Sequence, residues 1–313
     1  MNSAPHDRLS GEPLAQPPKE SSQALLFPDS PLPSVPQAVL FGDEDEPPRG
    51  LGFYARAFIE TTIPHTTPSV HEFSRKCGIY TLSLTAPAHS GLPSGVYPRR
   101  ILAWMTTQAL RVGSPNLFIG HLSTWAFNAL GITPTFGAKG TIPALRAQLF
   151  KLCNTSVRIM THLPSGRLDR SEGGGFQVTD YFNIVGEKAF VQLSPAFFEE
   201  ICRRPVPIDL DVLKQLRSPL TTDVYVFLTY RAIRSQRLRR PDPIRWTDLM
   251  DQFGCQFRLV RQFRHAFLAA IKKVLDFYPN VRLKHDEKHL IFLTYPPHVP
   301  RVAVPSSSPV LKP

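Results

Sequence analysis

The sequence contains no hydrophobic run long enough to cross a membrane and has few cysteines. No stretch of about 18 consecutive apolar residues occurs in the 313-residue chain, so no transmembrane helix is expected. The first residues, MNSAPHDRLSGEP, lack the basic-then-apolar pattern of a secretory signal peptide. The four cysteines lie about 50 or more residues apart and form no CxxC pair, which argues against a zinc site or a disulfide framework. A cytoplasmic protein is therefore predicted.

Sequence motifs of common enzymes are also missing. The glycine-rich residues 131–139 differ from a phosphate-binding loop in spacing and have no Ser or Thr after the lysine. The ten histidines form no HxH or HExxH pattern, and no GxSxG occurs. Tyr225 and Tyr230 lie on an apolar helical pattern and are expected in the core rather than at a nucleophilic site. We therefore predict no catalytic site, no metal and no cofactor.

Acidic residues are scarce outside the N-terminal region. The chain has 36 Lys+Arg and 25 Asp+Glu, a net charge of +11 and a pI near 9.7. Residues 1–48 hold two basic and eight acidic residues (−6), so the remaining chain holds 34 basic and 17 acidic residues (+17). Arginine is more frequent than lysine, and its guanidinium group suits bidentate contacts to phosphate and guanine. The charge favours nucleic-acid binding, and the alternative is a surface that only confers solubility.

The composition divides the chain into two tails and two folded domains. Residues 1–50 have ten prolines and the acidic run 43–46, and together with the Pro- and Ser-rich residues 296–313 they are predicted to be disordered. With 42% hydrophobic residues overall, the rest of the chain can form cores. We predict a first domain at residues 51–193 and a second at residues 194–295.

Hydrophobic periodicity and turn signals predict the same order of elements twice. Residues 98–193 and residues 218–295 both read as helix, short strand, short helix, long helix and β-hairpin. This is the order of a winged helix, in which the long helix enters a DNA groove and the hairpin forms the wing. The predicted fold class is α+β, mainly helical, with two tandem winged-helix domains. An alternating strand at residues 77–85 extends the first domain at its N-terminal side.

Local signals place the ends of several elements. The first long helix is predicted to start at Thr141, and its apolar positions continue to Ile159, before a loop at residues 164–175. In the second copy, Thr247 is predicted to cap the short helix, and the long helix is predicted at about residues 258–277.

The long helix of the second copy is predicted to carry a cationic face near its N-terminal half. Its polar residues there are Arg258, Arg261, Gln262, Arg264 and His265. The first three are predicted to contact base edges, with Arg on guanine and Gln on adenine, and the last two to contact phosphate. No carboxylate occurs between residues 256 and 275. The alternative is an amphipathic helix with an ordinary solvated face.

Further basic residues are expected to contact the phosphate backbone. An arginine-dense stretch precedes the second long helix, and a lysine lies on the predicted wing: Arg237, Arg239, Arg240, Arg245 and Lys284. In the first copy a weaker signal for DNA contact, direct base contact included, surrounds the long helix: Lys139, Thr141, Arg146, Gln148 and Lys151. Such contacts would give sequence-independent affinity with a steep dependence on salt. Arg99, Arg100 and Arg111 flank the first helix of that copy. For these three arginines, a structural role is the alternative to DNA contact.

The sequence resembles the plasmid-encoded RepA replication initiators over residues 50–298. The segments that carry this resemblance are residues 98–111 (PRRILAWMTTQALR), 120–125 (GHLSTW), 205–209 (PVPID), 218–220 (SPL), 223–225 (DVY), 228–231 (LTYR) and 252–254 (QFG), with Trp246, Phe263 and Arg264. The loop at residues 136–140 has fewer glycines than the family's pattern, and the helix after it keeps only Arg146 of an arginine pair. The first domain therefore has the weaker DNA-contact signal.

The resemblance implies a protein that binds repeated sites in double-stranded DNA at a plasmid origin. It also implies origin opening, recruitment of host replication proteins such as a helicase, and repression of the protein's own promoter as a homodimer. Three alternatives stay open on the sequence: a winged-helix transcriptional repressor without an origin role, a rolling-circle nicking enzyme and an RNA-binding protein.

Overall fold

The computed structural model describes residues 50–60, 62–77, 80–163, 170–203, 205–238, 240–254 and 257–299. Residues 1–49 and 300–313, which make up most of the two predicted tails, lie outside this part, as does Arg239. The last described residues differ from the prediction of a tail from residue 296. Tyr278 donates a hydrogen bond to the Pro296 carbonyl (2.5 Å), and the His298 ring stacks on the Tyr278 ring with centroids 4.5 Å apart. The folded body therefore extends to Val299.

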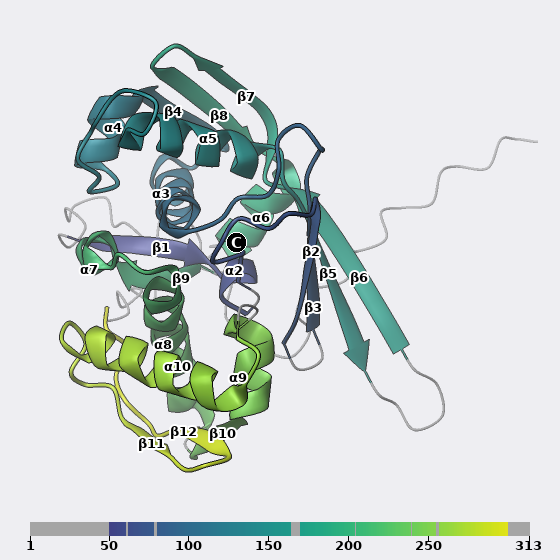
Figure 1. Cartoon of the computed structure of the whole chain (residues 1–313), viewed down its shortest axis with the longest axis vertical. Helices are drawn as coiled ribbons and strands as arrows, with labels where there is room; N and C mark the ends of the chain where they lie inside the picture. The colour runs from purple at the N-terminus through teal and green to yellow at the C-terminus, as the bar shows by residue number, and fades with distance from the viewer. Residues whose placement is uncertain are drawn as a thin grey trace, which may run out of the picture.

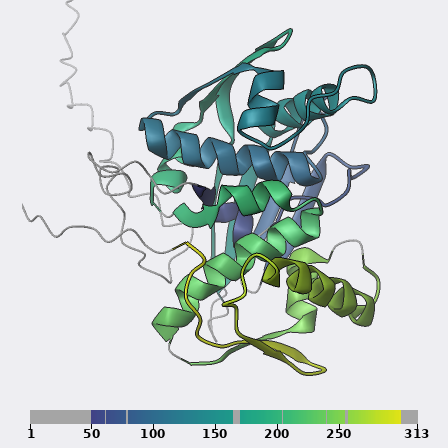
Figure 2. The ribbon, with the colours of Figure 1, turned by 90° about the vertical axis from the view of Figure 1, so that its left-hand side faces the viewer.

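The described chain contains both helices and strands (Figures 1 and 2). The helices are α2 (Ala57–Glu60), α3 (Val96–Val112), α4 (Leu122–Asn128), α5 (Thr141–Cys153), α6 (Pro195–Arg203), α7 (Leu210–Gln215), α8 (Pro219–Leu238), α9 (Trp246–Phe253) and α10 (Val260–Leu275). The strands are β1 (Leu51–Ala55), β2 (Glu72–Cys77), β3 (Tyr80–Thr85), β4 (Asn116–His121), β5 (Ser156–Leu163), β6 (Arg170–Gln177), β7 (Thr179–Val185), β8 (Lys188–Leu193), β9 (Pro205–Asp209), β10 (Asp242–Arg245), β11 (Leu283–His285) and β12 (His289–Phe292).

Two units repeat one arrangement of three helices and a three-stranded sheet. The first unit is α3–α5 with the sheet β4-β8-β7, and the second unit is α8–α10 with the sheet β10-β12-β11. Both sheets are antiparallel, and in each the last strand along the chain lies in the middle. The two units lie at opposite ends of the molecule (Figure 1). The predicted order of elements is therefore present twice.

The first unit is interrupted by the β5–β6 hairpin, whose residues were predicted from the sequence as the end of a helix and a loop. α5 ends at Cys153, and Val157 and Ile159 lie on β5 instead of continuing the helix. The predicted loop at residues 164–175 is wrong from Arg170 onward, because β6 pairs with β5 in the sheet β2-β3-β5-β6. Val157 and Ile159 are two residues apart, a spacing that suits a strand, so the apolar pattern alone did not separate the two interpretations.

Two other local predictions also need correction. The single strand predicted at residues 77–85 is the second half of a hairpin, because β2 and β3 pair over residues 72–85. Thr247 does not cap α9: Trp246 is already helical, and Arg245 occupies the N-cap position. Gly113 ends α3 in the left-handed conformation (φ 69°). The Asp209 side chain caps α7 by accepting hydrogen bonds from the backbone N–H groups of Asp211 (2.8 Å) and Val212 (3.1 Å).

A middle layer joins the two units. β1 pairs antiparallel with β9, although the two strands are about 150 residues apart in sequence. α6, β9 and α7, which the sequence analysis placed in the second domain, pack against α3 or β1 of the first. In the described part of the chain, one continuous group of buried apolar side chains extends from Leu51 to Tyr295. The two units thus share a core.

A buried ion pair connects the first helix of each unit. Arg99 on α3 donates to both carboxylate oxygens of Asp223 on α8, through Nε (2.6 Å) and Nη2 (2.7 Å). Its remaining N–H groups donate to the carbonyls of Ile63, Pro64 and Gly95. Burial alone would raise the pKa of Asp223, but the charge of Arg99 and the hydrogen bonds from His65 and Arg99 outweigh this and hold the pKa below its ordinary value.

Further buried polar contacts hold the same junction. Arg100 donates to the carbonyl of Leu130, which follows α4 (3.0 Å), and to the carbonyl of Lys214 on α7 (2.7 Å). Glu60 on α2 pairs with Arg56 and accepts a hydrogen bond from Tyr230 on α8 (2.7 Å). These contacts satisfy polar groups that would be costly to bury alone, so they favour one relative orientation of the units.

Removing Asp223 should destabilise the whole protein. Asp223→Ala leaves the Arg99 guanidinium buried without its counter-charge, so we expect a loss of about 3–5 kcal/mol in the free energy of unfolding. Urea denaturation followed by circular dichroism measures this. Glu199→Ala removes the partner of Arg203 in an exposed ion pair and should cost at most about 1 kcal/mol. Equal losses in the two variants would contradict the role assigned to Asp223.

His65 should make stability fall in mild acid. Its Nε2 lies 2.8 Å from Asp223 Oδ2, and burial lowers the pKa of His65 below its ordinary value despite the carboxylate. Because the pKa of His65 is lower in the folded state than in the unfolded state, the folded state binds fewer protons. The contribution of neutral His65 to the free energy of unfolding is therefore complete above about pH 6.5 and is lost as the pH falls. Urea midpoints between about pH 7.5 and 5.5 should therefore drop more steeply for the wild type than for His65→Gln. Parallel pH profiles for the two proteins would contradict the role assigned to His65.

Candidate nucleic-acid interface

α10 presents the cationic face that the sequence predicts. Phe263 and Phe267 are buried, which turns the other side of the helix to solvent. Arg261, Gln262 and His265 are exposed on that side. Arg258 is also exposed, but it lies before the helix, which begins at Val260 and not at the predicted residue 258. Within the described residues, no hydrogen bond or ion pair engages the side chains of Arg258, Arg261 or Gln262. Their donor groups are therefore free to bind a ligand.

The β11–β12 hairpin lies beside this helix. Arg264 is half-buried, and its Nη1 donates to the Glu287 carbonyl in the hairpin turn (3.4 Å). The Asp286 carboxylate accepts hydrogen bonds from the backbone N–H groups of Lys288 (2.7 Å) and His289 (2.6 Å). These two bonds close the turn and lower the pKa of Asp286. Lys284 is exposed on β11, so the hairpin adds a cation beside α10, while its turn carries the exposed Asp286 and Glu287.

The arginines from the C-terminal half of α8 to the start of α9 lie in different environments. Arg231 is buried, pairs with Asp242 and lies over the Phe292 ring, 4.7 Å from its centroid. Arg245 is exposed but makes a two-point ion pair with Asp248, with both N···O distances 3.0 Å. Arg240 is exposed. Arg239 lies outside the described residues, and the Arg237 side chain is not described either.

Several predicted contact residues of the first unit make internal hydrogen bonds. Thr141 Oγ1 donates to the Thr133 carbonyl (2.8 Å) and accepts from the Thr135 N–H (2.9 Å), which organises the loop before α5. Gln148 Oε1 accepts from the Ser94 N–H (2.9 Å), and Lys151 lies close to Gly91. Thr141, Gln148 and Lys151 therefore face other parts of the protein. Lys139 and Arg146 are exposed.

The arginines on α3 have a structural role, which the sequence analysis gave as the alternative to DNA contact. Arg99 and Arg100 are buried in the junction described above, and Arg111 donates to the Leu51 carbonyl (2.9 Å). Tyr225 and Tyr230 are also buried, as predicted, and burial raises the pKa of both hydroxyls. Neither tyrosine is accessible as a nucleophile in this conformation.

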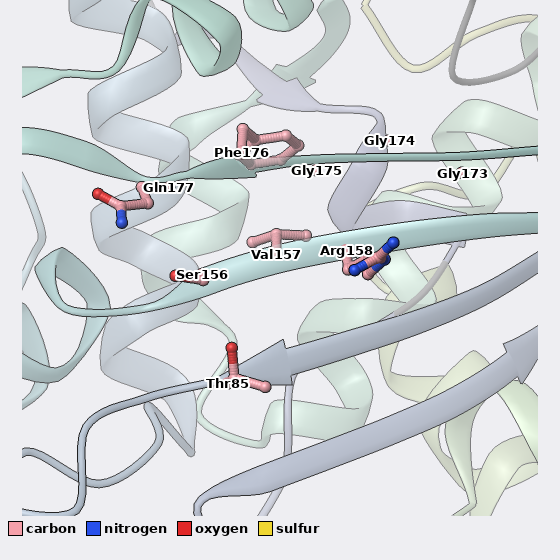
Figure 3. Close-up of a pocket in the computed structure, with 9 residues that line it drawn as sticks. All are labelled: Thr85, Ser156, Val157, Arg158, Gly173, Gly174, Gly175, Phe176 and Gln177. Carbon is pink, nitrogen blue, oxygen red and sulfur yellow. The ribbon is translucent and has the colours of Figure 1, made fainter.

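Sequence analysis missed a polar sheet face. The sheet β2-β3-β5-β6 buries residues such as Leu82 and Ile159 on one side, and its other side carries cross-strand rows such as Ser83, Arg158 and Gly175. A shallow pocket on this side is lined mainly by Thr85, Ser156, Arg158, Gly173, Gly175 and Gln177 (Figure 3). Arg158 is exposed. The alternation of polar and apolar residues from 156 to 159 was the available signal, but these residues were interpreted as part of a helix.

The described residues contain neither a metal-ligand cluster nor a membrane-spanning helix. No group of three or more His, Cys, Asp and Glu side chains is placed to hold a metal ion in that part of the chain. Among the same residues, no helix is both long and apolar enough to span a bilayer.

Comparisons with known proteins give a family and two distant structural similarities. Residues 92–247 match the family model described as plasmid-encoded RepA protein. No curated protein sequence matches the chain. A crystal structure of RctB domains 2 and 3 matches at a TM-score of 0.45 and 14% identity, covering 76% of this chain and 96% of that chain. A selenomethionine derivative of RctB domains 2 and 3 matches at 0.48 and 11% identity, with coverage of 75% and 94%.

Proposed function

Because this chain belongs to the family of plasmid-encoded RepA proteins, we propose that it initiates plasmid replication by binding repeated sites in double-stranded DNA at the plasmid origin. The observation that carries the proposal is the exposed, unpaired set of Arg261 and Gln262 on α10 with Arg258, which lies two residues before the helix. Bidentate Arg–guanine and Gln–adenine contacts are the common means of reading bases in the major groove.

The two units are winged helices in this proposal. Each has three helices and a three-stranded sheet whose last two strands form a hairpin beside the third helix. α10 enters the major groove with its N-terminal half leading, and the β11–β12 hairpin follows the phosphate backbone through Lys284. Arg264 and His265 contact phosphate. Because α10 contains two arginines and two lysines and no carboxylate, no side chain of that helix repels DNA.

The first unit makes fewer DNA contacts. Lys139 and Arg146 are its exposed cations around α5, and they suit phosphate binding better than base reading because neither has a neighbouring polar partner that would select a base. Thr141, Gln148 and Lys151 are left out of the proposed interface because they make contacts inside the protein.

The remaining steps follow from DNA binding rather than from catalysis. Several initiators side by side bend and strain nearby AT-rich DNA, and the energy for opening comes from binding and from recruited host replication proteins such as a helicase. The proposal assigns no chemical step and no cofactor to the chain. It places the protein in the cytoplasm, where it also represses its own promoter as a homodimer.

Arg258 and Arg261 should each contribute to specific DNA binding. We expect Arg261→Ala and Arg258→Ala to weaken binding to the protein's own site by about 1–3 kcal/mol each, with much smaller losses on random duplex. Fluorescence anisotropy on both duplexes at two salt concentrations measures this. Lys273→Ala, an exposed cation at the far end of the same helix, is the matched control. Equal losses on both duplexes would reassign the arginines to phosphate contacts.

The gene and its flanking DNA should support replication. We expect this fragment, joined to a selectable marker without an origin, to replicate autonomously in a suitable host, and the protein to protect regularly spaced repeats in the flanking DNA. The Arg258→Ala/Arg261→Ala double variant should abolish both. Protection of a promoter without autonomous replication would instead identify a transcriptional repressor.

A further inference from the structure

The first unit has an apolar groove along the outward face of α5. Pro143, Ala147 and Phe150 line one side at helical spacing, and Phe182 and Ile184 of β7 line the other. The Phe150 and Phe182 rings meet edge-on, with centroids 5.7 Å apart. Phe136, in the loop before α5, also lines the groove and is 63% exposed. Phe136 thus extends the apolar surface of the groove, and a contiguous apolar patch of this kind is typical of a docking surface.

This groove is unlike the corresponding surface of the second unit. The outward face of α10 carries Arg261, Gln262 and His265 in its N-terminal half, and Arg258 precedes the helix. The described residues that line the groove on α5 include only two charged ones, Arg146 and Glu187. Glu187 accepts a hydrogen bond from Ser123 of α4 (3.3 Å). An apolar lining gains little from contact with phosphate, but it gains from burying another apolar surface. The groove therefore fits an apolar peptide segment.

The N-terminal region contains a segment of the required chemistry. Residues 37–41 read Gln-Ala-Val-Leu-Phe, and the acidic run 43–46 follows directly after one glycine. A related sequence, Gln-Ala-Leu-Leu-Phe, occurs at residues 23–27 without such a run. Docking of Val39, Leu40 and Phe41 in the groove would bring the four carboxylates towards Arg146 and Lys139, the exposed cations beside it.

The length of the chain allows this contact within one molecule. Phe41 is nine residues from Gly50, and an extended segment of that length spans about 30 Å. The Gly50 carbonyl accepts from the Leu210 N–H at the start of α7 (2.7 Å), and Lys214 of α7 packs against Gly131. Gly131 starts the loop that carries Phe136, so one short helix and one loop separate Gly50 from the groove. A short tether also gives a millimolar effective concentration.

We propose that the groove between α5 and β7 is the docking site of residues 37–46 of the same chain. The apolar residues fill the groove, and the acidic run pairs with Arg146 and Lys139. Docking covers the outward face of α5 and withholds the first unit from DNA until the segment is displaced. This last consequence rests on the proposed DNA-binding function, whereas the docking itself does not.

Hydrogen–deuterium exchange of the full-length protein without DNA tests the docking. In Leu40→Ser/Phe41→Ser we expect the amides of residues 143–150 and 182–187 to exchange about tenfold faster than in the wild type, as for a segment whose effective concentration is ten times its dissociation constant. A free peptide of residues 35–48, added at millimolar concentration, should restore slow exchange to this variant. Ala147→Asp, at an exposed position in the groove, should exchange as the tail variant does.

The upstream copy provides the matched control. Leu26→Ser/Phe27→Ser should leave exchange in the groove unchanged. Groove exchange that is the same in the wild type and in Leu40→Ser/Phe41→Ser overturns the proposal, as does faster exchange in the upstream variant alone. Specific binding through α10 should persist in all these variants, so loss of DNA binding in the wild type would count against the proposed function and leave the docking result intact.

Discussion

The fold depends on one buried ion pair, Arg99 with Asp223. The two residues are 124 positions apart, and they lie on the first helix of each unit. Every N–H group of the Arg99 side chain donates to a carbonyl or to the carboxylate, and His65 completes the coordination of Asp223. A charge pair repays its desolvation only when its remaining donors are satisfied in this way. The geometry therefore admits one docking of α3 on α8.

This constraint carries over to the proposed binding surfaces. Because α3 and α8 are joined by the ion pair and by a shared apolar core, the helices that follow them, α5 and α10, are held at a fixed separation. Two DNA contacts on a rigid body select the spacing of their target sites, whereas two contacts on a flexible linker do not. The middle layer of β1, β9, α6 and α7 therefore sets the distance between the two surfaces that we propose as DNA contacts.

Local sequence signals predicted the elements of both units because those elements depend on local patterns. Glycine after α3 and α9, aspartate before α7 and the apolar stripe of α10 each mark a boundary or a face within a few residues. The β5–β6 hairpin and the β1–β9 pair were missed for a common physical reason. Their stability comes from strand pairing and shared burial, and glycines such as Gly173 to Gly175 give no propensity signal for a strand.

The candidate site was predictable to the same extent. The cationic face of α10 could be read from spacing, because exposed residues on a helix recur with its period. The internal partners of Thr141 and Gln148 could not, because they lie on separate loops whose approach depends on tertiary structure. Net charge also does not predict which cations are exposed. Arg99 and Arg100 of α3 contribute to the positive charge of the first domain, yet both are buried in the junction.

The two units show how one arrangement of elements supports different surfaces. Both sheets have the same strand order, and both third helices are held by buried apolar residues, so the inward faces obey one packing requirement. The outward faces are free of that requirement, and they differ: cationic on α10, apolar on α5. Function therefore has to be argued from the outward face of each unit and not from the fold that the units share. On that basis α10 suits DNA and the groove on α5 suits a peptide.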